Sequence, residues 1–285
     1  MRWDYAESPG RGAWGTPSSR SNFCEEDYVI TQYIAEFVNT LTNLTYVIYG
    51  IYGLRRVGPH KDGGLFSTLA SPYWGLIGVG VLSAWFHATL KYHSQMGDDL
   101  SMFLAVGAVL NQLQIFNQPP ATRRTRTLLI VGILIPVSVY HCWADEIYVH
   151  QITFAAMVLL CGRQIRKLIH ERIPNAEQKS RLLSLTSGAL ATGLLGYFLW
   201  NIDEHFCEYV TALKHTIGLP WAFVFELHGW WHIFTGIGAY VGMAVVEYLV
   251  TIEDGKTDKI EEGFVWPVSA VLRNLDAASS GRKTI

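Results

Sequence analysis

Two histidines close together in the sequence could bind one metal ion. The segment His228-Gly229-Trp230-Trp231-His232 places two imidazoles at positions i and i+4, one above the other on a single helix face. This spacing suits two ligands of one Zn²⁺, and a third His from another helix would leave the fourth coordination position for water. The same pattern also occurs where Trp gathers at a membrane interface, so the pair alone leaves both interpretations open.

Three further residues could complete a hydrolytic site. His87 is the natural third ligand, and Ser83 lies four residues before it, so both would face the same way on a helix. Asp98 could hold and deprotonate a water molecule, because Zn²⁺ lowers the pKa of the water that it binds towards about 7. Each residue also has a simpler explanation: an interior His with a hydrogen bond, a small residue at a helix contact, and an Asp that caps a helix.

A second group of ligands lies near the N-terminus. The stretch from Asn22 to Asp27 is rich in oxygen ligands, and Glu36 follows shortly after it. Such a group suits Ca²⁺, which takes about 6–8 oxygen ligands, backbone carbonyls included. The spacing differs from that of an EF-hand, and a solvated acidic segment that caps the first helix is the alternative. Glu36 favours the calcium site, because a carboxylate inside an apolar segment needs a cation.

The composition restricts the class of protein that carries these residues. The chain has 285 residues, of which 50% are hydrophobic and only 16% charged, and its mean hydropathy is +0.19. Soluble proteins carry about 25% charged residues. The apolar content excludes disorder, four Cys are too few for a disulfide-stapled miniprotein, and a net charge of −2 argues against a nucleic-acid partner.

The apolar residues come in long blocks separated by short polar stretches. A membrane-spanning helix needs about 20 predominantly apolar residues. We therefore predict an all-α integral membrane bundle of seven transmembrane helices, over Ile30–Leu54, Pro72–His93, Asp98–Phe116, Thr127–Trp143, Glu146–Leu168, Leu182–Ile202 and Trp221–Val250.

Lys and Arg are concentrated in the connections on one side of this predicted bundle, which is typical of the cytosolic side. The opposite side holds few basic residues: Arg2, Arg11, Arg20, Lys91 and Lys214. The sequence thus predicts a luminal N-terminal segment over residues 1–29 with the calcium site, a catalytic membrane domain over 30–250 and a cytosolic tail over 251–285. A cleavable signal peptide is not expected, because the first residues lack an apolar core.

In this arrangement His87, Asp98, His228 and His232 lie at similar depth, towards the luminal side. Ionisable residues within spans are costly, so their convergence favours a metal site over four separate structural explanations. Seven other histidines have no comparable partners in the sequence and are left out of the site: His60, His93, His141, His150, His170, His205 and His215.

Three of the four cysteines bear on the same region, since Cys161 is predicted to face the membrane or cytosol. Cys24 and Cys207 both fall on the oxidising luminal side and could pair, which would tie the N-terminal segment to the connection after the sixth span. Cys142 lies near the luminal end of the fourth span, so the pairing stays open on the sequence alone. Cys24–Cys207 is the pairing that we favour.

Several motifs of the chain resemble those of the alkaline ceramidases, seven-span intramembrane hydrolases of the endoplasmic reticulum and Golgi that are related to the adiponectin receptors. The similarity runs from about residue 14 to 267. It rests on the segments 23–28 (FCEEDY), 33–37 (YIAEF), 86–92 (FHATLKY), 200–203 (WNID) and 228–232 (HGWWH).

The resemblance implies a role for each matching residue. It implies His87, His228 and His232 as zinc ligands, Ser83 as support for the oxyanion and Asp98 as the group that handles protons. It implies a calcium site made by Asn22, Glu25, Asp27 and Glu36 through their side chains and by Phe23 through its carbonyl. Asn22 stands where the family has Asp and Asp27 where it has Asn, so the charge is unchanged. A disulfide matching Cys24–Cys207 is also implied.

The resulting hypothesis is a zinc-dependent amidase that hydrolyses a ceramide of the phytoceramide or dihydroceramide type to a sphingoid base and a fatty acid, regulated by calcium. Its partners would be the lipid substrate and membrane lipids, and no protein partner can be inferred. Two alternatives remain: a receptor similar to the adiponectin receptors with a structural or weakly hydrolytic zinc site, and a hydrolase of another lipid amide or ester.

Overall fold

A computed structural model describes residues 3–5, 11–59, 63–252 and 268–270. Every regular element in this part of the chain is helical, and β-pairing there is limited to isolated bridges. The helices are α1 (Phe37–Thr42), α2 (Leu44–Val57), α3 (Ser71–Thr89), α4 (Tyr92–Ile115), α5 (Pro120–Ala144), α6 (Tyr148–Arg172), α7 (Ala176–His205), α8 (Cys207–Ile217), the 3₁₀-helix η1 (Trp221–Phe225) and α9 (Leu227–Thr251).

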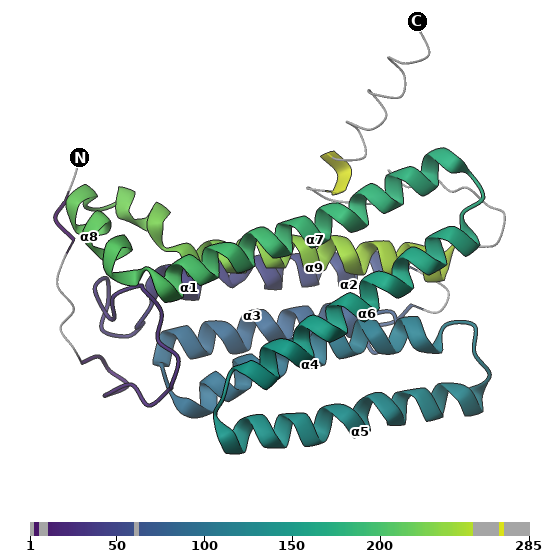
Figure 1. The fold of residues 1–285 in the computed structure, drawn as a ribbon, viewed down its shortest axis with the longest axis horizontal. Helices are drawn as coiled ribbons and strands as arrows, with labels where there is room; N and C mark the ends of the chain where they lie inside the picture. Colours follow the sequence, from purple (N-terminus) through teal and green to yellow (C-terminus); the bar gives the residue numbers. More distant parts are fainter. Residues whose placement is uncertain (1–2, 6–10, 60–62, 253–267, 271–285) are drawn as a thin grey trace, which may run out of the picture.

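The long helices run back and forth along one axis (Figure 1). α9 packs along α7 and α2, while α3 packs between α2 and α4. Each predicted apolar block overlaps most of one of the longer helices. The first block differs most, because its helix begins only at Phe37 and is interrupted at Asn43, between α1 and α2.

Among the described residues, three helices are long and apolar enough to cross a membrane by length and composition: α5, α7 and α9. The most apolar stretch of α5 is only 6% buried, and Leu129, Ile135 and Val139 on this helix are exposed. Such exposed apolar faces indicate association with a membrane. Seven spans and the orientation of the termini remain predictions. In α4, buried polar residues such as Gln95 and Gln112 lower the mean hydropathy of the helix.

α9 lies close to α1 and α2 because it carries glycines where they meet. A Cβ atom at Gly229 would lie 3.1 Å from Cγ1 of Val38, and one at Gly236 would lie 2.9 Å from Cγ2 of Thr45. These contacts leave no room for a larger residue. The start of α9, which carries the histidine pair, therefore packs closely against α1.

The N-terminal segment and α8 lie at the same end of the molecule as the start of α9 and the end of α3 (Figure 1). The backbone N–H of Glu36 donates to the carbonyl of His87, and that of Ala35 donates to the carbonyl of Ala88. α3 ends just beyond, where Leu90 adopts a left-handed conformation with φ of 49°. The residues that precede the first helix are thus attached to the helix end that carries His87.

Candidate active site

Three histidines converge at this end of the bundle. His87 comes from the last turn of α3, and His228 and His232 come from the first turns of α9. One ring nitrogen from each lies within 4.8 Å of the others, and the described residues hold no other such group of His, Cys, Asp or Glu. All three side chains are buried. The structure therefore brings together the three ligands that the sequence predicts.

Hydrogen bonds orient two of these rings. Nδ1 of His87 donates to Oε2 of Glu36 over 2.5 Å, and Nε2 of His87 is buried with no hydrogen-bond partner. Nδ1 of His232 lies 2.9 Å from Oγ1 of Thr42, whose own hydrogen points to carbonyls of α1. The Thr42 oxygen therefore accepts from His232, which leaves the lone pair of His232 on Nε2.

The third ring is held by stacking. His228 packs on Phe23 with ring centroids 3.6 Å apart, and its Nδ1 is buried with no hydrogen-bond partner. Buried polar atoms without partners are rare, and a metal ion would supply the missing interaction. Histidines that bind metals usually donate their second N–H to a carboxylate or another oxygen, as His87 and His232 do. The residues at this site fit a zinc ion.

Ser83 and Asp98 form a pair beside the histidines. Ser83 is buried one helical turn before His87 on α3, and its hydroxyl is hydrogen-bonded to the carboxylate of Asp98 on α4. Asp98 lies in the second turn of α4, directly after the connection from α3. The structure thus places both predicted catalytic side chains next to each other, Ser83 on α3 together with His87 and Asp98 on the adjacent α4.

The predicted calcium ligands lie in the N-terminal segment that covers the site. Asn22 is hydrogen-bonded to Asp27, and the N–H of Phe23 donates to Oε1 of Glu36 over 3.1 Å. Glu25 is buried and accepts from the N–H groups of residues 38 and 39 over 2.6 and 2.8 Å. These contacts make Glu25 the cap of α1, a role that the sequence reasoning had offered as the alternative.

The carboxylates of this segment repel one another. Burial, followed by repulsion from Glu226 and Glu36, raises the pKa of Glu25 well above its usual value. Burial and then repulsion from Glu36 raise the pKa of Asp27 to about 6. The desolvation and the repulsion would both be reduced by a bound cation.

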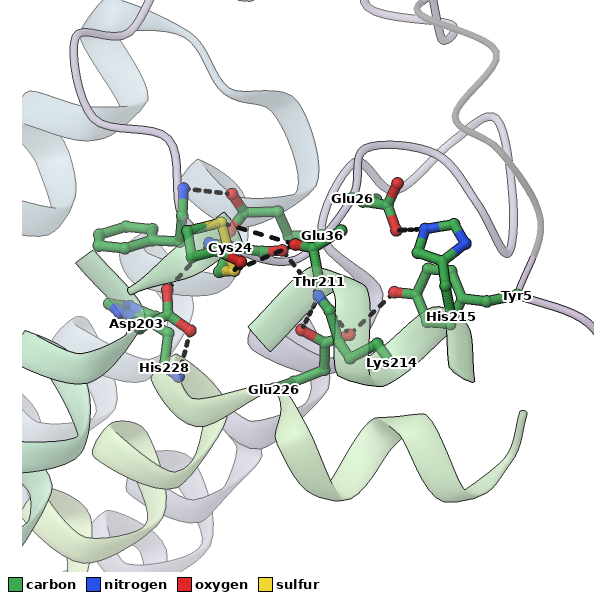
Figure 2. Close-up of a disulfide and its surroundings, with 12 residues drawn as sticks. Tyr5, Cys24, Glu26, Glu36, Asp203, Thr211, Lys214, His215, Glu226 and His228 are labelled. Carbon is green, nitrogen blue, oxygen red and sulfur yellow. Dashed lines mark hydrogen bonds and ion pairs between the residues drawn. A yellow bond between two sulfur atoms is a disulfide. The ribbon is translucent and has the colours of Figure 1, made fainter. Parts of the chain in front are cut away.

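A disulfide joins the N-terminal segment to α8, as Figure 2 shows. Cys24 and Cys207 are bonded, with their Cα atoms 5.1 Å apart, whereas Cys142 is free. The favoured pairing is therefore present. Next to it, the carboxylate of Asp203 accepts from the N–H of Cys24 over 2.9 Å and from the N–H of His228 over 3.3 Å. Asp203 thus connects the disulfide to the first turn of α9.

A buried ion pair lies on the other side of the disulfide (Figure 2). Nζ of Lys214 donates to the carbonyl of Cys24 over 2.7 Å and to the carboxylate of Glu226 over 3.0 Å. Neither side chain of the pair is exposed by more than 1%. Tyr5 donates to the same carboxylate over 2.9 Å, and burial with repulsion from Glu226 raises the pKa of Tyr5 strongly.

Sequence reasoning missed some of these residues. His141 and His150 were left out of the site for lack of comparable partners; they are not part of the histidine cluster, but both contact Asp99. His215 likewise pairs with Glu26 over 2.8 Å, while His60 lies outside the described residues. Asp203 belongs to one of the motifs quoted above, but no signal in the sequence pointed to its two acceptor contacts.

The site and the fold together define an all-helical protein with a buried three-histidine centre and an adjacent Ser–Asp pair. A sequence profile of the Ceramidase family matches residues 15–274. Over 268 residues the chain is 32% identical to "Alkaline ceramidase YPC1" of Saccharomyces cerevisiae, with 88% of this chain and 83% of that protein covered.

Similar relatives occur in distant organisms. The chain is 29% identical to "Alkaline ceramidase 3" of Mus musculus, with 90% of this chain and 94% of that protein covered. It is 27% identical to "Alkaline ceramidase" of Drosophila melanogaster, with 87% and 80% covered. The chain belongs to the ceramidase family and is therefore a hydrolase, which confirms the resemblance seen in its motifs.

Proposed function

We propose that this protein hydrolyses the amide bond of ceramide with the help of Zn²⁺ and releases a sphingoid base and a fatty acid. Membership of the ceramidase family supports ceramide hydrolysis. The observation that carries the zinc proposal is the buried cluster of His87, His228 and His232, in which one ring nitrogen of each lies within 4.8 Å of the others and two buried ring nitrogens, Nε2 of His87 and Nδ1 of His228, have no hydrogen-bond partner.

Zn²⁺ held by these histidines would polarise the amide carbonyl and make water a stronger acid. Asp98 would take the proton of the attacking water and later return it to the leaving amine, as general base and then as general acid. Ser83, on the same face of α3 as His87, would donate a hydrogen bond to the oxygen that becomes negative. Ser83 is not a nucleophile in this scheme, because a metal-activated water makes a covalent intermediate unnecessary, and Asp98, the carboxylate beside its hydroxyl, acts on that water.

The substrate would enter from the lipid phase. Ceramide carries two hydrocarbon chains, and the apolar exposed faces of the long helices support access of membrane lipids to the site. We further propose a seven-span arrangement in the endoplasmic reticulum or Golgi membrane with the site towards the lumen. The segregation of Lys and Arg and the presence of a disulfide at the site end of the molecule support this orientation.

Calcium would regulate the same site through Glu36. This carboxylate contacts Phe23 of the N-terminal segment through one oxygen and His87 through the other. A Ca²⁺ ion held by Asn22, Glu25, Asp27 and Glu36 with the Phe23 carbonyl would therefore fix the segment that stacks on His228 and orients His87.

Bound zinc and fatty-acid release from a ceramide panel, measured on the purified protein, test this function. We expect His232→Ala to lose both, while His170→Ala, which removes an exposed histidine of α6, keeps both. Full hydrolysis by His232→Ala without metal would overturn the proposal. Ligand binding by the wild type without stoichiometric fatty-acid release would favour a receptor, and release from other lipid amides or esters but not from ceramide would favour a different hydrolase.

A further inference from the structure

Two adjacent acids of α4 face different neighbours. Asp98 is hydrogen-bonded to Ser83 of α3. The carboxylate of Asp99 contacts Nε2 of His141 at the end of α5 over 3.0 Å, and the carbonyl of Asp99 contacts Nε2 of His150 in α6 over 3.0 Å. Both of these histidines are buried, and their ring centroids are 4.9 Å apart.

The contacts of His141 fix the number of protons that it shares with Asp99. Its Nδ1 lies 2.8 Å from the carbonyl oxygen of Glu146, which can only accept, so Nδ1 carries a hydrogen. Its Nε2 faces the carboxylate of Asp99, so either His141 is a cation beside an ionised Asp99 or Asp99 carries the proton. In both cases one proton lies between the two groups, and the pair has no net charge. His150 needs only the neutral form that carries its hydrogen on Nε2.

We propose that His141 is a positioning residue for the hydrolytic reaction: it cancels the charge of Asp99 and fixes the rotation of α4, so that Asp98 works next to a neutral neighbour. The inference rests on the role proposed above for Asp98. The hydrogen bonds of Asp99 to α5 and α6 and that of Asp98 to α3 hold α4 from two sides. The contacts described for His141 are with Glu146, Asp99 and His150, so a change at His141 removes no direct contact of Asp98.

Removing His141 would leave two neighbouring carboxylates without a counter-charge. Besides Asp99, the titratable groups that interact electrostatically with Asp98 are Glu36 and Tyr46. Those that face His141 are Asp99, His150 and Glu146. An uncompensated Asp99 would make Asp98 keep its proton to a higher pH, because like charges disfavour ionisation. The acidic limb of the pH–kcat profile would therefore move to higher pH.

The experiment measures the pH–kcat profile of the purified full-length, zinc-loaded protein with a ceramide substrate. We expect His141→Gln to move the acidic limb upward by on the order of one pH unit, the effect of one neighbouring charge at an effective dielectric constant of about 20, with KM unchanged. Asp99→Asn should leave it close to the wild-type position, because without the carboxylate the buried His141 is neutral and the pair still has no net charge. The double variant His141→Gln/Asp99→Asn should return it close to the wild-type position. His93→Gln, which changes an exposed histidine at the same end, is the control.

A His141→Gln enzyme with reduced kcat but an unshifted limb would overturn the inference, since His141 would then act only in packing. If His141→Gln does not fold, Asp99→Asn is the test variant, and a limb that moves downward would show that the Asp99 charge is not cancelled in the wild type and would overturn the inference. A double variant whose acidic limb stays at the position of His141→Gln would also overturn the inference. Absence of ceramide hydrolysis in the wild type overturns the proposed function as well, so the two failures are distinguishable.

Discussion

Oε2 of Glu36 accepts a hydrogen bond of 2.5 Å from Nδ1 of His87, and both side chains are fully buried. The same two residues are joined through the backbone, where the N–H of Glu36 donates to the carbonyl of His87. The carboxylate fixes the hydrogen of His87 on Nδ1 and turns the lone pair of Nε2 towards His228 and His232. Glu36 is therefore the structural connection between the N-terminal segment and the histidine cluster.

Replacing Glu36 by Gln should weaken zinc binding. The amide can still accept from His87, but it no longer supplies the charge that makes the imidazole a better ligand. We expect an affinity for Zn²⁺ that is about 10–100-fold lower, measured by competition with a chromogenic chelator. Glu26→Gln is the matched control, because Glu26 pairs with His215 and has no contact with the cluster. Equal zinc affinities of Glu36→Gln and the wild type would contradict this role.

Replacing Asp203 by Ala should loosen the start of α9. Its carboxylate accepts from the N–H groups of Cys24 and His228, and a hydrogen bond to a charged group contributes about 1.5–3 kcal/mol. We expect a lower temperature of half-inactivation and faster loss of metal, with a smaller effect for Asp203→Asn, whose amide oxygen can keep one bond. Glu204→Ala alters an exposed neighbour on α7 and should behave like the wild type. Identical behaviour of Asp203→Ala and Glu204→Ala would rule out this contribution.

Replacing Lys214 by Met should destabilise the protein by leaving Glu226 buried without its counter-ion. Breaking a buried ion pair from one side costs about 3–5 kcal/mol. The double variant Lys214→Met/Glu226→Gln should recover part of this loss, because the neutral amide still accepts from Tyr5. Thermal unfolding of the wild type, the two single variants and the double variant gives the coupling free energy between Lys214 and Glu226. Additive effects of the two substitutions would show that the pair makes no joint contribution.

Selective removal of calcium should lower both activity and thermal stability while zinc is retained. A ligand present at 100 times its Kd stabilises the folded state by about 2.7 kcal/mol. We therefore expect a calcium chelator to lower the unfolding temperature of the wild type, with Asp27→Ala showing a smaller response. Zinc content, measured in the same samples, is the control. Unchanged activity and unfolding temperature after chelation would refute the regulatory role of calcium.

Much of the architecture could be predicted because it depends on local composition. Apolar blocks of helical length indicated where the long helices lie, and every block overlaps most of one. The break at Asn43 could not be predicted from hydropathy. It separates α1, whose Thr42 contacts His232, from α2, which packs on α3. Residues 30–36, counted as part of the first span, are not helical, and Ala35 and Glu36 instead bond to the end of α3.

The histidine site was predictable for a different reason. The spacing of His228 and His232 places both on one helix face whatever surrounds them, and the alternation of helix ends brings His87 to the same side. The partners that orient the rings were only partly predictable. Glu36 stood out as an acid in an apolar segment, whereas Thr42 gave no signal.

The sequence by itself determined that this chain is helical, rich in apolar surface, and equipped with three histidines, a serine and an aspartate at one end, since periodicity and spacing act within each helix. Only the tertiary structure decided which partners those residues have. The contacts of His141 with Asp99, of Asp203 with His228 and of Lys214 with Glu226 join separate helices. A buried polar group is stable only beside a complementary group, and the packing of whole helices determines which groups meet.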